Sequence, residues 1–319
     1  MNIFSCAAST SNTGFSSCNY SPGLIEAAIL VPRGKEYTPS EVAAMLTTLQ
    51  ADLIDDVQLD RVQIIKTFIG MEDKSSEGVY ETTGYGGNRK IRNGKYQWQF
   101  EYSKGALCLH KKLSTLDNKQ ELYDVIFVDT AENCLLGVKK GVNFGGFNIE
   151  LIDIPNFKMN KGASDSKYYI HFQLQDPRQM NLYAATVVFD ASVNLLDELN
   201  SLQDTSIELI TAMDNTGQIV ITVKDSCGGA YLGDTFDTEI MDTDNWDLIR
   251  DSTGNAITLT GVVGTYNSIT KGITLNFDSS DTDYTAGQTA TLYFGRLVSD
   301  LVTSGIEGYA GSSLQVTLG

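Results

Sequence analysis

Strict alternation of apolar and polar residues is the feature that most constrains how this chain folds. Residues 96–102 read Tyr-Gln-Trp-Gln-Phe-Glu-Tyr, so every second side chain is aromatic. Successive side chains of a β-strand point to opposite faces, so this segment predicts a strand with one buried face. Other runs rich in β-branched and aromatic residues lie at 62–69, 77–83, 122–128, 134–138, 147–154, 168–174 and 183–189. The chain is therefore predicted to be mainly β.

One or two short helices are expected among these strands. Thr38 is followed by Pro39 and Glu41, which is a capping box with Pro at the first helical position. Apolar residues then recur at helical spacing, which predicts a helix over 39–54. A second helix is predicted over 192–202, with Asp190 as its cap. Residues 104–119 fit either a short helix or a long loop.

The chain is expected to divide into an arm and two domains. Residues 1–20 predict an arm that orders against a partner, although an ordinary frayed terminus fits equally well. Residues 21–205 predict a β-sandwich or barrel-like assembly domain. Short strands separated by turn residues then predict an immunoglobulin-like β-sandwich over 211–319, with Trp246 in its core.

Charge and cysteine content exclude several classes of protein. The net charge is −17, and residues 211–319 hold 14 acidic against 4 basic residues. Such an acidic surface is typical of a soluble protein and does not favour binding to nucleic acid, whose phosphates are contacted by Lys and Arg. No apolar run approaches the roughly 18 residues of a membrane-spanning helix, and the N-terminus lacks the features of a secretory signal. The five cysteines form no C-x-x-C pair, so reduced thiols and synthesis in the cytoplasm are expected.

The sequence offers no catalytic or cofactor-binding motif. Its two histidines form no metalloprotease pattern, and its glycine clusters lack the spacing of a phosphate-binding loop. His171 sits in a predicted strand, where packing is the favoured role. A Cys108–His171 nucleophile pair stays open on sequence alone. We expect the protein not to be an enzyme.

Two clusters of loop carboxylates are candidates for structural calcium, because Ca²⁺ takes six to eight oxygen ligands. Solvated loop acids are the favoured alternative, since neither cluster matches the helix-loop-helix calcium motif. The candidate ligands are Asp242, Asp244, Asp247, Asp278, Asp281 and Asp283.

A long exposed excursion is predicted between residues 70 and 93, where Gly, Ser, Asn and charged residues concentrate. Its segment 84–90 is flexible and locally basic. Such a loop either stays free or docks on a neighbouring copy. The candidate contacts between subunits are Tyr85, Arg89, Lys90 and Arg92.

This plan resembles virion structural proteins of tailed bacteriophages. The resembling residues of the acidic domain are 217–223 (Gly-Gln-Ile-Val-Ile-Thr-Val), 273–277 (Ile-Thr-Leu-Asn-Phe) and 308–318. Tail-tube proteins are similar in plan, and several carry an appended immunoglobulin-like domain.

The resemblance implies a homo-oligomeric ring or tube in the virion, next to other virion proteins, as a tail-tube or neck-ring subunit. DNA would pass through it without specific binding, and no membrane would be a partner. An alternative is a capsid decoration or head-fibre protein whose sandwich binds host surface or glycan.

Overall fold

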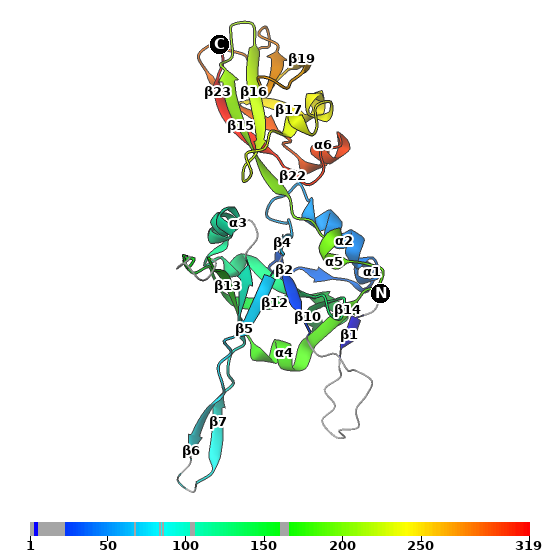
Figure 1. Cartoon of the computed structure of the whole chain (residues 1–319), viewed down its shortest axis with the longest axis vertical. Coiled ribbons are helices and arrows are strands. Elements are labelled where there is room, and N and C mark those ends of the chain that lie inside the picture. Colours follow the sequence, from blue (N-terminus) through cyan, green and yellow to red (C-terminus); the bar gives the residue numbers. More distant parts are fainter. Residues whose placement is uncertain are drawn as a thin grey trace. The chain divides into compact units, whose positions relative to one another are not determined.

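The computed structural model forms two compact units (Figure 1). It describes residues 3–5, 23–66, 68–82, 84, 86–102, 106–159 and 166–319, so most of the expected arm lies outside the described residues. The first unit ends at Asn200, and the second holds Ser201–Gly319 together with Ile54–Asp56. Strands predominate in both units, which confirms the prediction of a mainly β chain. The first strand of the second unit starts at Gln203, earlier than the expected start at 211.

A barrel forms the centre of the first unit. Its strands follow the order β4–β2–β9–β12–β13–β8–β5. The strands at the two ends of this order, β4 and β5, are separated in the chain by residues 66 and 67 only. The last strand of the sheet therefore lies next to the first. The bounds are β2 Ile25–Pro32, β4 Gln63–Ile65, β5 Phe68–Asp73, β8 Gln97–Tyr102, β9 Tyr123–Asp129, β12 Phe147–Asp153 and β13 Tyr168–Leu174.

Aromatic side chains fill the barrel. The ring of Phe127 on β9 contacts Trp98, Phe100, Phe147 and Phe172, with centroids 5.2–6.1 Å apart. Trp98 and Phe100 come from β8, whose burial alternates along its whole length, as the sequence predicts. Each large ring removes apolar surface from water and fixes its neighbours through edge and tilted contacts.

A second layer of strands and helices covers the other face of β2 and β9. Strand β9 pairs with β12 along one half and with β10 along the other, so the sheet branches there. The branch contains β10 Cys134–Lys140, β14 Ala184–Val188, β1 Ile3–Ser5, β11 Asn143–Gly145 and β3 Glu36–Tyr37. Helices α1 Pro39–Ala43, α2 Met45–Leu53 and α5 Leu195–Glu198 supply side chains to the apolar core of this layer.

The predicted helices exist but are shorter than expected. The capping box at Thr38 forms, because the Thr38 N–H donates to Glu41 Oε2 at 2.7 Å and Glu41 N–H donates to Thr38 Oγ1. Ala44 leaves the helical conformation and divides the predicted helix into α1 and α2. The predicted helix over 192–202 contains only α5, whose cap is Asn194 instead of Asp190. The described part of 104–119 forms helix α3 Ala106–Leu113 and the short η1 Ser114–Leu116, so the helical alternative holds there.

Helices α4 Pro177–Tyr183 and α6 Val298–Thr303 were not predicted from the sequence. The Asp176–Pro177 pair is the signal that was missed for α4, since Asp176 caps the helix and Pro177 opens it. No helix among the described residues is long and apolar enough to cross a membrane.

The second unit is a sandwich of two sheets with immunoglobulin-like strand order. One sheet runs β19–β20–β16–β15–β22 and the other runs β18–β17–β21–β23. In chain order this places the first, second, fourth and fifth main strands in one sheet, which is the arrangement of immunoglobulin domains. The bounds are β15 Gln203–Thr211, β16 Gln218–Asp225, β17 Trp246–Arg250, β18 Ala256–Ile257, β19 Leu259–Asn267, β20 Gly272–Phe277, β21 Thr289–Phe294, β22 Tyr309–Ala310 and β23 Ser312–Thr317.

Trp246 lies in the core of the sandwich, as expected. It opens β17, is 3% exposed, and packs on Phe294 of β21 with ring centroids 4.9 Å apart. Its indole N–H donates to the Ile240 carbonyl at 3.0 Å, so the one polar atom of the buried ring is satisfied. The three short 3₁₀ segments η3 Leu232–Asp234, η4 Glu239–Met241 and η5 Thr243–Asn245 lie between β16 and β17.

We predict that Phe294→Ala destabilises the second unit alone. Removing a fully buried ring costs about 3–5 kcal/mol, and Phe294 contacts no residue of the barrel core. The chain has two Trp, one in each core. In a Trp98→Phe background the fluorescence of Trp246 therefore reports urea unfolding of the second unit. In a Trp246→Phe background the fluorescence of Trp98 reports unfolding of the first. Phe172→Ala is the matched control and should shift the Trp98 transition only. A Phe294→Ala change that moved both transitions equally would contradict independent cores.

Candidate functional site

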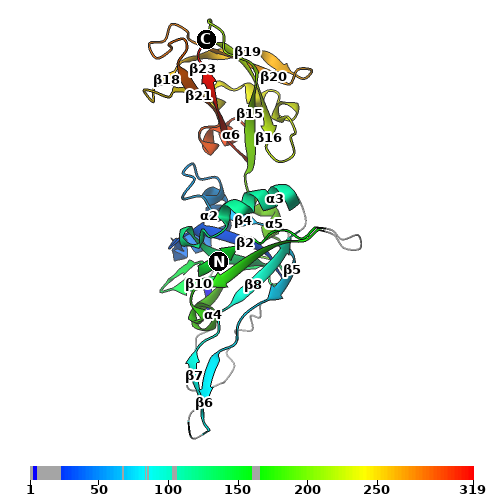
Figure 2. The ribbon, with the colours of Figure 1, turned by 90° about the vertical axis from the view of Figure 1, so that its left-hand side faces the viewer.

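A long hairpin projects from the barrel between β5 and β8 (Figures 1 and 2). Its two strands are β6 Val79–Thr82 and β7 Asn88–Arg92, which within the described part of the chain pair only with each other. Every residue of both strands is exposed. An isolated two-stranded hairpin is marginally stable in water, so this element lacks the tertiary support that the rest of the unit has. The predicted excursion between residues 70 and 93 is therefore a β-ribbon and not an irregular loop.

The hairpin combines apolar and basic side chains. Ile91 is 58% exposed and Tyr80 is 60% exposed, and neither is covered by its own unit. Tyr80 lies opposite Lys90 in the strand register, and Glu81 lies opposite Arg89. Residues at such cross-strand positions face the same side of the ribbon. Both faces thus present apolar and charged groups together, the mixture found at the edges of protein interfaces.

The structure brings together three of the four residues predicted as contacts between subunits. Arg89, Lys90 and Arg92 all lie on β7, while Tyr85 lies outside the described residues. Sequence analysis missed Tyr80 and Ile91. Their signal is present in the sequence, because both residues lie in the predicted exposed excursion and Tyr80 lies in the strand predicted over 77–83.

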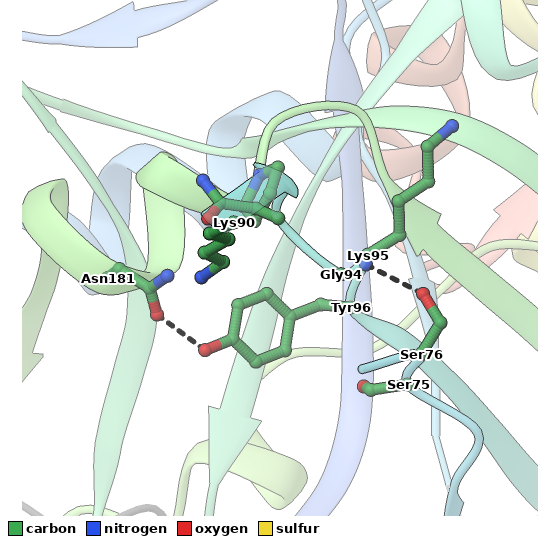
Figure 3. A pocket seen from close by; sticks show the side chains of 9 residues that line it. Ser75, Ser76, Lys90, Gly94, Lys95, Tyr96 and Asn181 are labelled. Carbon is green, nitrogen blue, oxygen red and sulfur yellow. Dashed lines mark hydrogen bonds between the residues drawn. The ribbon is translucent and has the colours of Figure 1, made fainter. Parts of the chain in front are cut away.

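A polar hollow of about 200 Å³ lies at the root of the hairpin (Figure 3). It is lined by Ser75, Ser76, Lys90, Asn93, Gly94, Lys95, Tyr96, Pro177 and Asn181. The Tyr96 hydroxyl donates to Asn181 Oδ1, which fixes α4 against the root. The backbone N–H of Lys95 donates to Ser76 Oγ at 2.9 Å. A ligand site for a drug-sized molecule usually measures about 300–1,000 Å³, so this hollow suits a side chain better than a cofactor.

Close backbone approach holds the two legs of the hairpin together at this root. The Ser76 N–H donates to the Lys95 carbonyl at 3.0 Å. A Cβ atom at Gly94 would lie 1.7 Å from the Ser76 carbonyl oxygen, so only glycine fits at that position. These contacts between the two legs fix the backbone beside the hollow, and the hairpin extends beyond them.

Among the residues that the structure describes, strand β5 pairs along one edge only, beside this root. It bonds to β8 along one side, whereas β2 pairs with β4 and not with β5. Ile69 and Met71 of β5 are 61% and 48% exposed. Unpaired edges of this kind accept strands from other chains.

The two carboxylate clusters are structured as turns. Asp242 accepts from the Asp244 N–H, and Asp278 accepts from Ser280 N–H at 2.8 Å. Asp281 accepts from Thr258 and from the Asp283 N–H, and Asp283 accepts from Asn255 Nδ2. Within the described residues no group of three or more acidic, His or Cys side chains has the geometry of a metal site.

The open Cys108–His171 pair is not assembled. His171 lies on β13, where its ring bonds to Asp153 Oδ2 at 2.9 Å and to Gln99 Oε1 at 3.0 Å. Cys108 and Cys227 are disulfide-bonded, so the expectation of reduced thiols was wrong for both. The spacing of cysteines in the sequence does not show which sulfurs meet in space. Cys134 is a buried reduced cysteine of β10.

The chain matches no protein-family model, and no curated protein or solved structure is similar enough to count as a match. The geometry of the hairpin and barrel therefore carries the functional argument by itself.

We predict that Asp281→Asn lowers the thermal midpoint of the second unit at neutral pH. Hydrogen bonds from Asp283 and Thr258 lower the pKa of Asp281 from its ordinary value of 3.8. A lowered pKa in the folded state adds stability above the ordinary value, and that stability is lost as the pH falls through the lowered pKa. The thermal midpoint of the wild type should therefore decrease when the pH is lowered below about 4. The thermal midpoint of the variant should change less with pH.

The matched control is Glu307→Gln, which removes one exposed carboxylate. It should leave both the neutral midpoint and the pH profile unchanged when melting is followed by circular dichroism. An Asp281→Asn profile that overlays the wild type at every pH would show that these turn bonds add nothing to stability.

Proposed function

We propose that this chain is a self-assembling structural protein that forms rings or a tube through its barrel unit. The observation that carries the proposal is the β6–β7 hairpin, which pairs only with itself and exposes every strand residue. Covering it with a neighbouring copy would bury Tyr80 and Ile91 and would supply the support that its own unit lacks. The open edge of β5 supports the same reading, because strand pairing between copies removes exposed edges.

The tail tube of a tailed bacteriophage, or its neck ring, is the assembly that we favour. In this proposal the barrel units form the conduit and DNA passes without specific binding. The outer sides of β8 and β13 fit such a passage, since their side chains include Gln99, Glu101, His171 and Gln173. Glu101 holds Lys167 in an ion pair at 3.1 Å, so that cation is already neutralised. Surfaces that bind DNA tightly need cations that are available to phosphates.

The immunoglobulin-like unit is proposed as an appended module that assembly does not require. It has its own apolar core, formed entirely by residues of this unit. Its strongly acidic composition favours solubility and an outward position. The protein would act in the virion, beside other virion proteins, and would have no enzymatic activity.

Negative-stain electron microscopy of three proteins tests this proposal. The first is the full chain, the second ends at Asn200, and in the third residues 77–93 are replaced by a short glycine turn. The Ser76–Lys95 backbone bond closes the root, so this replacement leaves the barrel strands intact. We expect rings or tubes of constant diameter from the first two and dispersed particles from the third.

Two outcomes would contradict the proposal. Tubes from the hairpin replacement would show that the hairpin is not an assembly element. Dispersed monomers from all three proteins at high concentration would exclude intrinsic self-assembly and would favour a decoration protein that needs a pre-built capsid.

A further inference from the structure

The hairpin is a basic segment of a chain that is acidic as a whole. Residues 74–95 hold five basic and two acidic residues, whereas the whole chain has a net charge of −17. A basic hairpin is thus attracted to the acidic surface that predominates on a second copy. Complementary charge of this kind steers association and fixes register between partners.

Lys90 is the residue of β7 whose cation lines the hollow, and like Arg89 and Arg92 it has no ion-pair partner among the described residues. Lys95 pairs with Glu150, and Lys74 pairs with Glu72. Lys90 lies in the polar hollow beside Tyr96 and Asn181, while the Lys95 side chain extends away from it (Figure 3). One ammonium group thus lines a hollow whose described lining residues include no carboxylate.

The other groups lining the hollow complete a site for a carboxylate. Ser76 and Asn93 bring a hydroxyl and a carboxamide group, which can donate hydrogen bonds to carboxylate oxygens, whereas the Ser75 hydroxyl already donates to the Gln97 carbonyl. The Tyr96 ring forms an apolar wall on which the methylene groups of an acidic side chain can rest. The volume of about 200 Å³ fits one side chain and not a larger ligand.

We propose that this hollow receives an Asp or Glu side chain from a second copy of the chain, with Lys90 as its counter-ion. The proposal rests on the proposed self-assembly and names one of its contacts. A charge-assisted hydrogen bond in a partly enclosed site is stronger than a neutral one. It would therefore set the register at which one hairpin docks on the next copy.

Lys90→Glu in the full-length protein tests the assignment, with Arg92→Glu as its matched control. Both change the same charge on the same strand, but Arg92 does not line the hollow. We expect Lys90→Glu to raise the critical concentration for assembly by about tenfold or more, equivalent to ~1.4 kcal/mol per contact. Arg92→Glu should raise it far less, and Lys90→Arg should restore most of the wild-type value. Light scattering against protein concentration gives the critical concentration, and thermal melts check that each variant folds.

Each other outcome overturns the proposal in a recognisable way. Equal effects of Lys90→Glu and Arg92→Glu would mean that the hairpin acts through net charge alone. Unchanged assembly of Lys90→Glu, combined with loss of binding to a duplex DNA fragment, would assign the hollow to a phosphate. Wild-type protein that never assembles would overturn the proposed function and this contact together, whereas assembly that is insensitive to Lys90→Glu would overturn only the contact.

Discussion

Strand β9 is the element on which the rest of the first unit depends. Both of its edges are paired, with β2 on one side and β10 and β12 on the other. Its side chains alternate between two cores, so Val125 and Phe127 face the barrel while Ile126 and Val128 face the helices. Every residue of this strand from Asp124 to Asp129 is buried, which explains the apolar run from Val125 to Val128.

Buried carboxylates mark the two ends of β9. Asp129 accepts hydrogen bonds from the backbone N–H groups of Gly23, Leu24, Ala131 and Glu132, which ties the β9–β10 turn to the chain before β2. Burial raises the pKa of Asp124, although the Gly34 N–H and the cations of Lys140 and Arg33 oppose that shift. Core packing along β9 and polar bonds at its ends therefore fix the barrel without any help from the hairpin. That independence leaves the hairpin available for a partner.

Much of this fold follows from local sequence patterns, and what does not follow depends on long-range contacts. The alternation over 96–102, the capping box at Thr38 and the β9–β10 hairpin were all predictable, because neighbours in sequence determine them. The branching of the sheet at β9 was not, because it joins strands that lie far apart in the chain. The break at Ala44 and the disulfide bonding of Cys108 were not predicted either. For the site, the basic character of β7 was visible in the sequence. The hollow was not, since it joins the root of the hairpin to α4, about a hundred residues later.

Hydrogen–deuterium exchange at two protein concentrations tests most directly whether the hairpin is an assembly element. The amides of β6 and β7 bond only within the hairpin, so they should exchange rapidly in dilute monomer. At a concentration where particles form they should become protected, while the amides of β9 stay protected throughout. Equal, rapid exchange of the hairpin in monomer and assembled particle would contradict the account, because the hairpin would then be uncovered in both states.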